Sequence, residues 1–553
     1  MAEGPTGVAG VVAGEDFQTW SRIPVRQSYG PADVADLDHG RDIGEPGQYP
    51  FTRGIHEGGY RQRRWITRQL CGLDTPVATN RRLRFLLDQG QTGLALVPDT
   101  PTQLGLDSDH PMGQRSAGMQ GVPIATLGDM DDLFADIPLE GVTASFSVPG
   151  TCVPVLLAQY VAMADRRGIP RDRLRGSFQN DPVQATHCGY DAGNPLDLGL
   201  KLCIDTIEFC ARELPNFHST TVNAYDLRES GLDAVQEMAI TLAIAGAYLE
   251  RAVARGLDVD DIGRRMLVIS GCHIDFFEEV AKFRAARRIW ARMMRERFGA
   301  RRERTCALTI AVHTAGSSLV APQPINNVIR GAYEALAAVL GGCQGLDISS
   351  FDEAVAIPSE ESSVVALRTQ QIIARETGVT NTVDPLGGSY FVEALTTELE
   401  RRMLDLMAEI ERQGGIIAAA ERGWLRQTID QAQFELRREI ASGRRQIVGL
   451  NVYAIPPEQD TLLRIAKTHR RPSRQQVARV RRWKRQRDQR ATAAALRALY
   501  AVAAARQENL IPSITRATTE GATLGEILGT IRLGYGYSYD PVGAVAPPFP
   551  IAP

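Results

Sequence analysis

From about residue 93 onward, short apolar segments alternate along the chain with longer amphipathic ones. The longer segments repeat apolar residues at helical spacing and predict helices over 153–167, 232–255, 276–298 and 325–340. The short segments are rich in β-branched residues, which is typical of buried parallel strands. They predict eight strands, at 94–97, 142–148, 174–178, 220–224, 266–270, 307–313, 346–349 and 380–383.

Repeated strand–helix units predict an α/β fold, specifically a (β/α)8 TIM barrel. A doubly wound sheet is the competing architecture, but no GxGxxG motif follows the first strand. We expect the barrel over residues 49–415. Residues 1–48, rich in Gly, Pro and Asp, predict an extended N-terminal arm, and residues 416–553 predict a helical C-terminal region with a tail.

Polar side chains follow most of the predicted strands. In a TIM barrel these strand ends converge on one face, which is where active sites lie. A single residue of this kind is more often a helix cap or a turn residue, so the group is more informative than any member. The group comprises Asp99, Gln179, Asn180, Asp181, Tyr225, Asp226, His273, His313, Thr314, Ser349, Ser350 and Asp384.

Composition narrows the class of protein. The chain has 553 residues and a formal net charge of −3, which argues against a general nucleic-acid binder. Eight scattered cysteines without a CxxC pair indicate reduced thiols in a cytoplasmic protein. No apolar run of membrane-spanning length occurs, so we expect no membrane contact.

An arginine-rich stretch covers residues 464–490. A solvated helix or a strap that docks a subunit is favoured there over a nucleic-acid site, because only Trp483 offers a ring for base stacking.

Two motifs near the start of the predicted barrel combine arginines with aromatic residues. They are YPFTRG at 49–54 and YRQRRWITRQ at 60–69, and neither contains a carboxylate. The arginine guanidinium presents planar, bidentate donors that suit phosphate and pyrophosphate groups. A basic loop packed on an acidic neighbour is the alternative interpretation.

These motifs resemble the YPFTRG and YxxRxWxxRQ signatures of the acyl-CoA mutase large-subunit family. That family includes methylmalonyl-CoA, isobutyryl-CoA and 2-hydroxyisobutyryl-CoA mutases. The resemblance runs from about residue 23 to the C-terminus, and its DTPTQLG wording favours the isobutyryl and hydroxyisobutyryl branch. Further markers are TRQLCG (67–72), DTPTQLGLDSDHP (99–111), GSFQND (176–181), EVAKFRAARRIW (279–290), SSFDEA (349–354) and DPLGGSY (384–390).

The resemblance implies roles for individual residues. Gln179 and Tyr225 would contact the substrate, and Gln344 would face it. Glu353 and Ser349 would face the cofactor. The phosphates of CoA would be bound by Arg63 and Arg284, with Arg68 in the same motif as Arg63, and the pantetheine arm would pass between Thr143, Ser145, Ser147 and Ser177.

The resemblance also implies adenosylcobalamin as cofactor. The family's DxHxxG loop, which supplies a histidine to cobalt, does not occur in this sequence. We therefore expect a separate cobalamin-binding small subunit. The expected assembly is a heterotetramer built on a large-subunit homodimer.

Three substitutions distinguish this chain from the family at the predicted active site. Asp226 follows Tyr225 where the family has histidine, and Ala311 and His313 replace a histidine and a glutamine. An ionised aspartate cannot donate a hydrogen bond to a thioester carbonyl, so we hypothesise that Asp226 and His313 form a couple that restores a donor. The alternative is that the substitutions are unrelated.

The substrate pocket also differs. Gly189 stands where the methylmalonyl enzymes have the arginine that binds a free carboxylate, which argues against methylmalonyl-CoA as substrate. Leu70 replaces an aromatic residue that limits substrate size, so a larger or more branched acyl group is expected to fit. The aspartate that recognises the hydroxyl in the hydroxyisobutyryl enzyme is expected near residues 96–98 and does not occur there.

The sequence therefore predicts the large subunit of an adenosylcobalamin-dependent acyl-CoA mutase acting on a branched or linear, non-carboxylated thioester. A non-catalytic acyl-CoA-binding paralogue that stabilises a partner mutase is one alternative. A mutase for a carrier-protein thioester is another. The sequence leaves open the acyl group, the direction of isomerisation and the protonation state of Asp226.

Overall fold

The computed structural model describes residues 17–148, 150–188, 194–456, 458–460 and 471–550. Its strands form two parallel five-stranded sheets, in the orders β1-β10-β9-β8-β7 and β2-β3-β4-β5-β6. The fold is therefore α/β with parallel strands, as predicted. The strands are β1 (Ile66–Arg68), β2 (Leu70–Cys71), β3 (Gly93–Leu96), β4 (Thr143–Phe146), β5 (Gly176–Phe178), β6 (Phe217–His218), β7 (Thr220–Asn223), β8 (Met266–Cys272), β9 (Thr309–Thr314) and β10 (Gly345–Asp347).

The two sheets meet along the chain at two places. Gln69 alone separates β1 from β2, and Ser219 alone separates β6 from β7. β1 pairs with β10, whereas β2 pairs with β3. β6 pairs with β5, whereas β7 pairs with β8. Each near-continuous strand therefore belongs to one sheet by its first half and to the other by its second half.

Seven of the eight predicted strands are present, and the eighth is wrong. Residues 380–383 form turns that end at Asp384, whose side chain accepts hydrogen bonds from Arg53 and Arg284. The missing strand is β1–β2, which begins inside the arginine-rich motif at 60–69. Its period is obscured because Arg68 is buried, opposite Asp347 in the register with β10.

The four predicted helices are present as α5 (Val153–Arg166), α9 (Ala234–Ala254), α11 (Phe276–Arg292) and α13 (Asn326–Leu340). Polar caps fix several helix starts; Asp233, for example, accepts the Gln236 N–H and begins α9. The other long helices are α2 (Pro76–Asp88), α7 (Leu196–Glu213), α14 (Glu360–Arg375), α15 (Tyr390–Arg412), α17 (Trp424–Ala441), α18 (Arg474–Gln486), α19 (Gln489–Ala505), α20 (Ile511–Thr519) and α21 (Leu524–Gly534).

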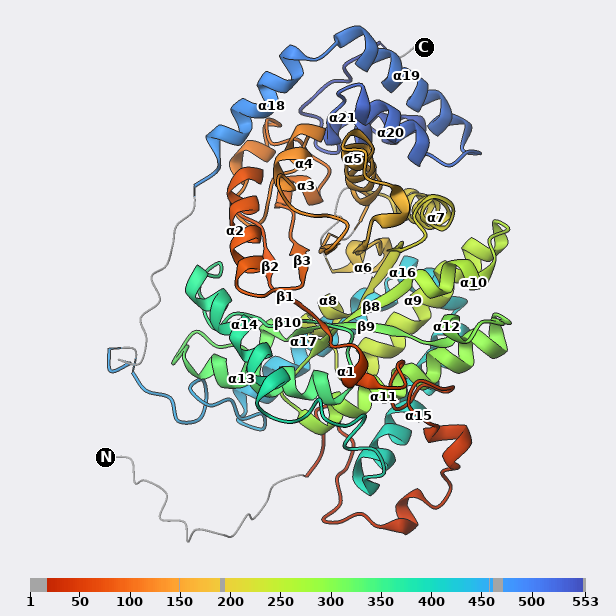
Figure 1. The fold of residues 1–553 in the computed structure, drawn as a ribbon, viewed down its shortest axis with the longest axis vertical. Helices are drawn as coiled ribbons and strands as arrows, with labels where there is room; N and C mark the ends of the chain where they lie inside the picture. The colour runs from red at the N-terminus through yellow and green to blue at the C-terminus, as the bar shows by residue number, and fades with distance from the viewer. Residues whose placement is uncertain (1–16, 149, 189–193, 457, 461–470, 551–553) are drawn as a thin grey trace.

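The apolar core lies outside the strands, between them and the surrounding helices. One cluster joins β3–β5 to α5 and α19–α21, and a larger one joins β8–β10 to α9, α11 and α13–α15. Figure 1 shows α18–α21 at the top of the molecule, over α4 (Leu127–Leu133) and α5. The side chains on the inner side of the strands therefore do not belong to this core and line a different space.

The basic helix α18 binds the chain's own acids. Arg479 Nε lies 2.8 Å from Asp129 Oδ1, and Lys484 Nζ lies 2.9 Å from Asp107 Oδ2. It is therefore an internal strap, and residues 464–470 of the predicted stretch lie outside the described residues.

The cysteines and the apolar helices can also be compared with the sequence-based expectations. The cysteines form no disulfide within the described chain, and all but Cys188 are buried. Among the helices of the described part, none combines the length and apolarity that crossing a bilayer requires.

Candidate functional site

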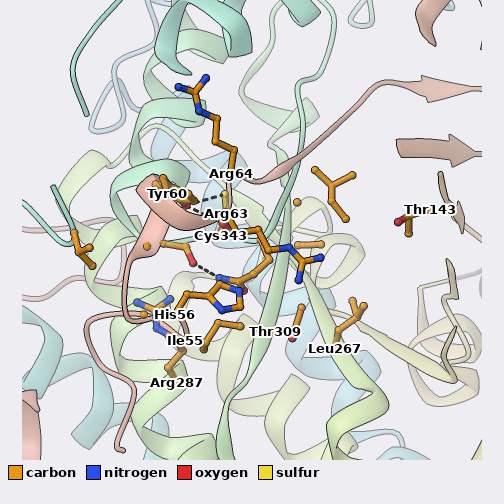
Figure 2. Close-up of a pocket in the computed structure, with 18 of the residues that line it drawn as sticks. Ile55, His56, Tyr60, Arg63, Arg64, Thr143, Leu267, Arg287, Thr309 and Cys343 are labelled. Atoms are coloured by element: carbon orange, nitrogen blue, oxygen red, sulfur yellow. Dashed lines mark hydrogen bonds between the residues drawn. The ribbon is translucent and has the colours of Figure 1, made fainter. Parts of the chain in front are cut away.

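A pocket opens at the end where the parallel strands begin. Thr143 and Ser145 of β4, Ser177 of β5, and Thr309 and Ala311 of β9 line it. On β4 and on β9 the two residues are two apart, and Ser177 pairs with Ser145 in the register, so their side chains point to the same side. The predicted tunnel residues Thr143, Ser145 and Ser177 are therefore together in one space. Figure 2 labels Thr143, Leu267 and Thr309 among the residues that line it.

Cations gather at the mouth of this pocket. Arg63 lies there near His56 (Figure 2), and Arg64, Arg304 and His218 are also in the lining. Burial, reinforced by the positive charge of Arg304 and Arg63, lowers the pKa of His56 and brings that of His218 to about 4. Both imidazoles are therefore neutral at neutral pH, and the arginines carry the charge. The mouth suits a multiply charged anion.

Arg68 lies deeper in the pocket and is buried. Its Nη1 donates to Ser145 Oγ at 2.9 Å, and its Nη2 lies 2.7 Å from Asp347 Oδ2. Ser177 Oγ in turn donates to Ser145 Oγ at 3.1 Å. The predicted substrate-binding arginine thus forms part of a polar network across the pocket.

Gln344 lines the pocket, but its side-chain amide is hydrogen-bonded to backbone groups. Its Oε1 accepts the Ile310 N–H at 2.8 Å, and its Nε2 donates to the Gly342 carbonyl at 2.7 Å. Gln344 also precedes β10, at the opposite end of the strand from Ser349. It holds the β9–β10 edge at the pocket.

Arg284 does not have the predicted place. Its side chain is 1% exposed and lies outside the pocket lining, 2.6 Å from Asp384 Oδ1 and 2.5 Å from Glu393 Oε1. Asp384 lines the pocket and also accepts from Arg53 Nε at 3.1 Å. Two carboxylates pair with Arg284, so in the described structure it positions Asp384 and does not line the pocket. The motif could not reveal these distant partners.

A second group of polar residues lies where the strands end. Asn223 Nδ2 donates to Asp226 Oδ2 at 2.7 Å and lies 3.4 Å from Gln179 Oε1. Gln184 Nε2 donates to the same Asp226 oxygen at 3.0 Å. The predicted residues Gln179 and Asp226 are therefore joined through Asn223. Sequence analysis missed Asn223 and Gln184, although Asn223 comes just before the Tyr225–Asp226 pair.

The hypothesised Asp226–His313 couple is not formed. His313 Nε2 bonds Ser349 Oγ at 3.0 Å, and its ring stacks on Tyr225 with centroids 4.6 Å apart. Burial lowers the pKa of His313 to about 4 and raises that of Asp226 to about 7. At neutral pH the histidine is neutral and a large fraction of the aspartate is protonated. The donor that was expected from the histidine is available from Asp226.

Tyr225 is close to two further acids. A methyl group placed on Gly316 would lie 3.2 Å from Glu229 Oε2, 3.3 Å from the Tyr225 hydroxyl and 3.7 Å from Ser349 Oγ. Glu229 binds the N–H and hydroxyl of Ser317. Burial raises the pKa of Glu229 to about 7 and that of Glu353 to about 8. The strand ends thus hold several acids that are partly neutral at pH 7.

The remaining predicted residues lie at the edges of this site or beyond it. Ser147 directly follows β4, and its N–H donates to the Leu96 carbonyl at 2.7 Å. Leu70 is half-buried on β2. Gly189 lies outside the described residues. Leu267 and Ile269, which sequence analysis missed, form with Ala311 an apolar group that packs beside Tyr225. The sequence pattern that could have revealed them is the alternation of inward-facing positions along β8 and β9.

Comparison with known proteins places the chain in a family. The model of the methylmalonyl-CoA mutase family matches residues 18–537. The 2-hydroxyisobutanoyl-CoA mutase large subunit of Aquincola tertiaricarbonis is 40% identical over 529 residues, which cover 96% of this chain and 94% of that protein. Methylmalonyl-CoA mutases of Rhizobium meliloti and Escherichia coli are 37% and 36% identical; each alignment covers 94% of this chain and 72% of the relative. The chain belongs to the methylmalonyl-CoA mutase family of isomerases.

Proposed function

We propose that this chain is the large, substrate-binding subunit of an adenosylcobalamin-dependent acyl-CoA mutase. The reaction is the 1,2-migration of the thioester carbonyl group that interconverts a branched and a linear, non-carboxylated acyl thioester. The observation that carries the proposal is one pocket that combines a basic mouth with an interior lined by hydroxyl groups on the inner side of the strands. Family membership supports the same reading.

The two sheets support a closed eight-stranded barrel. β1 and β2 count as one strand interrupted at Gln69, and β6 and β7 as one interrupted at Ser219. Counted in this way, every strand has a parallel neighbour on both sides. The pocket then runs along the barrel axis, and the polar cluster lies at the carboxyl ends of the strands, where TIM-barrel active sites lie.

The CoA thioester enters by the basic mouth. Arg63, Arg64 and Arg304 pair with its phosphates, and Thr143, Ser145 and Ser177 contact the pantetheine arm. At the far end Gln179 orients the thioester. Its Oε1 is used by Asn223, and its Nε2 has no partner among the described residues, so that N–H is available to the thioester carbonyl.

The strand ends also fit the cofactor. Tyr225, Glu229 and Ser349 crowd around Gly316 and would present two hydroxyls and a carboxyl group to the cofactor's ribose. Glu353, with its raised pKa, can donate a hydrogen bond there. When bound, adenosylcobalamin supplies the homolytic bond cleavage on which the rearrangement depends. The chain contributes orientation and the exclusion of water.

A separate small subunit completes the enzyme in this proposal. The chain covers 94% of a relative named as a large subunit, and that name implies a small-subunit partner. We propose that this partner carries the cobalamin. We propose a heterotetramer with a large-subunit homodimer at its centre.

Replacing Arg63 and Arg64 with alanine is expected to raise KM about 10-fold for a CoA thioester and to leave kcat nearly unchanged. The arginines meet only the phosphate end of the substrate, which is the same in the ground and transition states, so uniform binding is lost. Steady-state kinetics of the assembled enzyme with isobutyryl-CoA provides the measurement.

The matched control uses the corresponding pantetheine thioester, which has no nucleotide phosphates. Its KM is expected to be the same for the wild type and the variant. An equal rise in KM for both thioesters would contradict the assignment of the mouth. Equal use of both by the wild type would instead favour a carrier-protein thioester.

A further inference from the structure

The guanidinium of Arg287 is held by backbone carbonyl groups. Arg287 lies on α11 and is 1% exposed. Its Nε donates to the Phe51 carbonyl at 2.9 Å, its Nη2 to the Thr52 carbonyl at 3.0 Å and its Nη1 to the Gly341 carbonyl at 2.7 Å. Each of its three nitrogens therefore makes a hydrogen bond, but none of these partners carries a negative charge.

The three carbonyl groups belong to two different walls of the pocket with the basic mouth. Two of them lie in the YPFTRG motif, whose next residues, 53–55, line the mouth. The third belongs to Gly341 at the end of α13, and the residues after it, 342–344, line the pocket before β10 begins. Arg287 is itself one of the lining residues (Figure 2). It therefore joins the loop of the motif to the α13–β10 turn along one side of the pocket.

No ion pair joins Arg287 to an acid of the described chain. Its neighbours on α11, Arg284 and Arg288, each pair with a carboxylate. Asp384 attracts Arg287 electrostatically, but both oxygens of Asp384 already accept hydrogen bonds from other arginines. Burial and the positive charge of Arg284 lower the pKa of Arg287 to about 10. Arg287 is therefore a buried cation at neutral pH, and its charge is not neutralised locally.

A buried cation without an anion is unfavourable, because no ion pair offsets its loss of hydration. The pocket itself does not supply the missing charge. Seven arginines line it, and Asp384 is the only acid among the lining residues of the described chain. A ligand with several negative charges would therefore stabilise Arg287, which the carbonyl groups hold in place without neutralising it.

We propose that Arg287 is a positioning residue for the substrate, which fastens the 51–54 loop to the α13–β10 turn and leaves at the mouth a positive charge that the phosphates of CoA neutralise. A charge in a poorly hydrated site acts over several ångströms, so Arg287 need not touch the phosphates. The phosphate end is the same in the ground and transition states, so Arg287 serves binding and not the chemical step. The inference rests on the proposed function and adds a residue to it.

The test is calorimetric titration of the purified full chain with CoA, with dephospho-CoA and with pantetheine, the last measured by its displacement of bound CoA. Arg287→Met removes the charge and keeps most of the volume. It is expected to weaken CoA binding roughly 10-fold, dephospho-CoA binding less and pantetheine binding not at all, because the loss follows the number of phosphate charges. Arg287→Lys, which keeps the charge with fewer hydrogen bonds, is expected to recover most of the CoA affinity.

Arg288→Met is the matched control. Arg288 is the next residue on α11, is equally buried and donates to Thr52 Oγ1, but Glu400 neutralises it and it does not line the pocket. This variant is expected to lose stability and to keep the wild-type ratio of CoA to pantetheine affinity. Urea denaturation of each variant measures its stability separately. If Arg287→Met does not fold, Arg287→Gln, whose amide can still donate to a carbonyl group, takes its place in the titrations.

Three outcomes would overturn the inference and leave the proposed function standing. The first is CoA binding by Arg287→Met that equals the wild type. The second is an equal loss for CoA and pantetheine that Arg287→Lys does not restore, which would limit Arg287 to a structural role. The third is the same selective loss in Arg288→Met, which would assign the effect to the loop and not to the charge. A wild-type chain that binds none of the three ligands would instead overturn the proposed function itself.

Discussion

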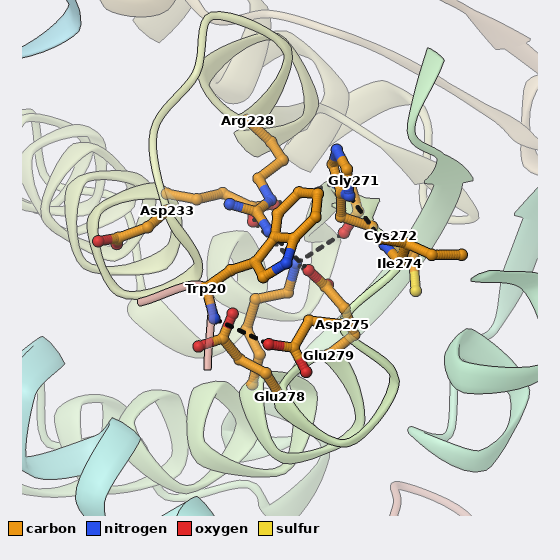
Figure 3. A network of polar contacts seen from close by, with 12 residues as sticks. Trp20, Arg228, Asp233, Gly271, Cys272, Ile274, Asp275, Glu278 and Glu279 are labelled. Carbon is orange, nitrogen blue, oxygen red and sulfur yellow. Dashed lines mark hydrogen bonds and ion pairs between the residues drawn. The ribbon is translucent and has the colours of Figure 1, made fainter. Parts of the chain in front are cut away.

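Replacing Lys282 with methionine is expected to lower the free energy of unfolding by about 3–5 kcal/mol. Lys282 is fully buried on α11, with Nζ 2.8 Å from Glu237 Oε2 and 2.5 Å from Glu279 Oε2. Without it, both carboxylates share Arg228 alone, which lies 3.8 Å from Glu237 and 3.0 Å from Glu279. Figure 3 shows Arg228 and Glu279 in this network, beside Trp20 of the N-terminal arm. Urea denaturation measures the change.

Two further variants test whether the loss of stability comes from the buried carboxylates that Lys282→Met leaves without a cation. Arg401→Met, which removes a surface partner with a side chain 59% exposed, is expected to cost less than about 1 kcal/mol. Lys282→Met combined with Glu237→Gln is expected to recover part of the loss, since one orphaned carboxylate is removed. A Lys282→Met variant as stable as Arg401→Met would mean that the network adds nothing to the fold.

Replacing Arg68 with methionine is the second change for which a large effect is expected. Arg68 bridges Ser145 and Asp347 inside the pocket, and Asp347 is 2% exposed. Methionine fills most of the volume but leaves Asp347 without a cation, which costs about 3–5 kcal/mol in a buried pair. Denaturation midpoints provide the stability readout, and thioester titration provides the binding readout.

The double variant Arg68→Met with Asp347→Asn separates the two roles of Arg68. Stability is expected to return most of the way, because no buried charge remains. Thioester affinity is expected to stay low if Arg68 contacts the substrate. Full recovery of both properties would limit Arg68 to a structural role, and failure of Asp347→Asn to restore stability would rule out the ion pair as the source of the loss.

Much of the fold follows from the sequence because the strands are short apolar runs between amphipathic helices. The first strand escaped prediction because Arg68 points inward in it, and a buried arginine is recognised only once its partner Asp347 is known. Residues 380–383 carry strand-forming side chains, yet they form turns that end at Asp384, where two arginines converge.

Site residues that face the pocket from alternate positions of a strand could be predicted from the sequence. Site residues held by partners far along the chain could not. Thr143, Ser145 and Ser177 lie together because alternate positions of neighbouring strands face one space. Arg284 is matched by Asp384 and Glu393, about a hundred residues along the chain, and no local pattern indicates such pairs. Asp226 was expected to pair with His313, but Asn223 and Gln184 are nearer along the chain and hold it instead.

The measurement that tests the central claim most directly is an anaerobic assay of this chain with a cobalamin-binding small subunit and adenosylcobalamin. The thioesters are 2-hydroxyisobutyryl-, isobutyryl-, pivalyl-, isovaleryl- and methylmalonyl-CoA, with products identified by mass spectrometry and chromatography. We expect turnover of a branched, non-carboxylated thioester to its linear isomer, and none by the chain alone. Turnover of methylmalonyl-CoA in preference to the others, or no turnover by a complex that binds both cofactor and thioester, would contradict the account.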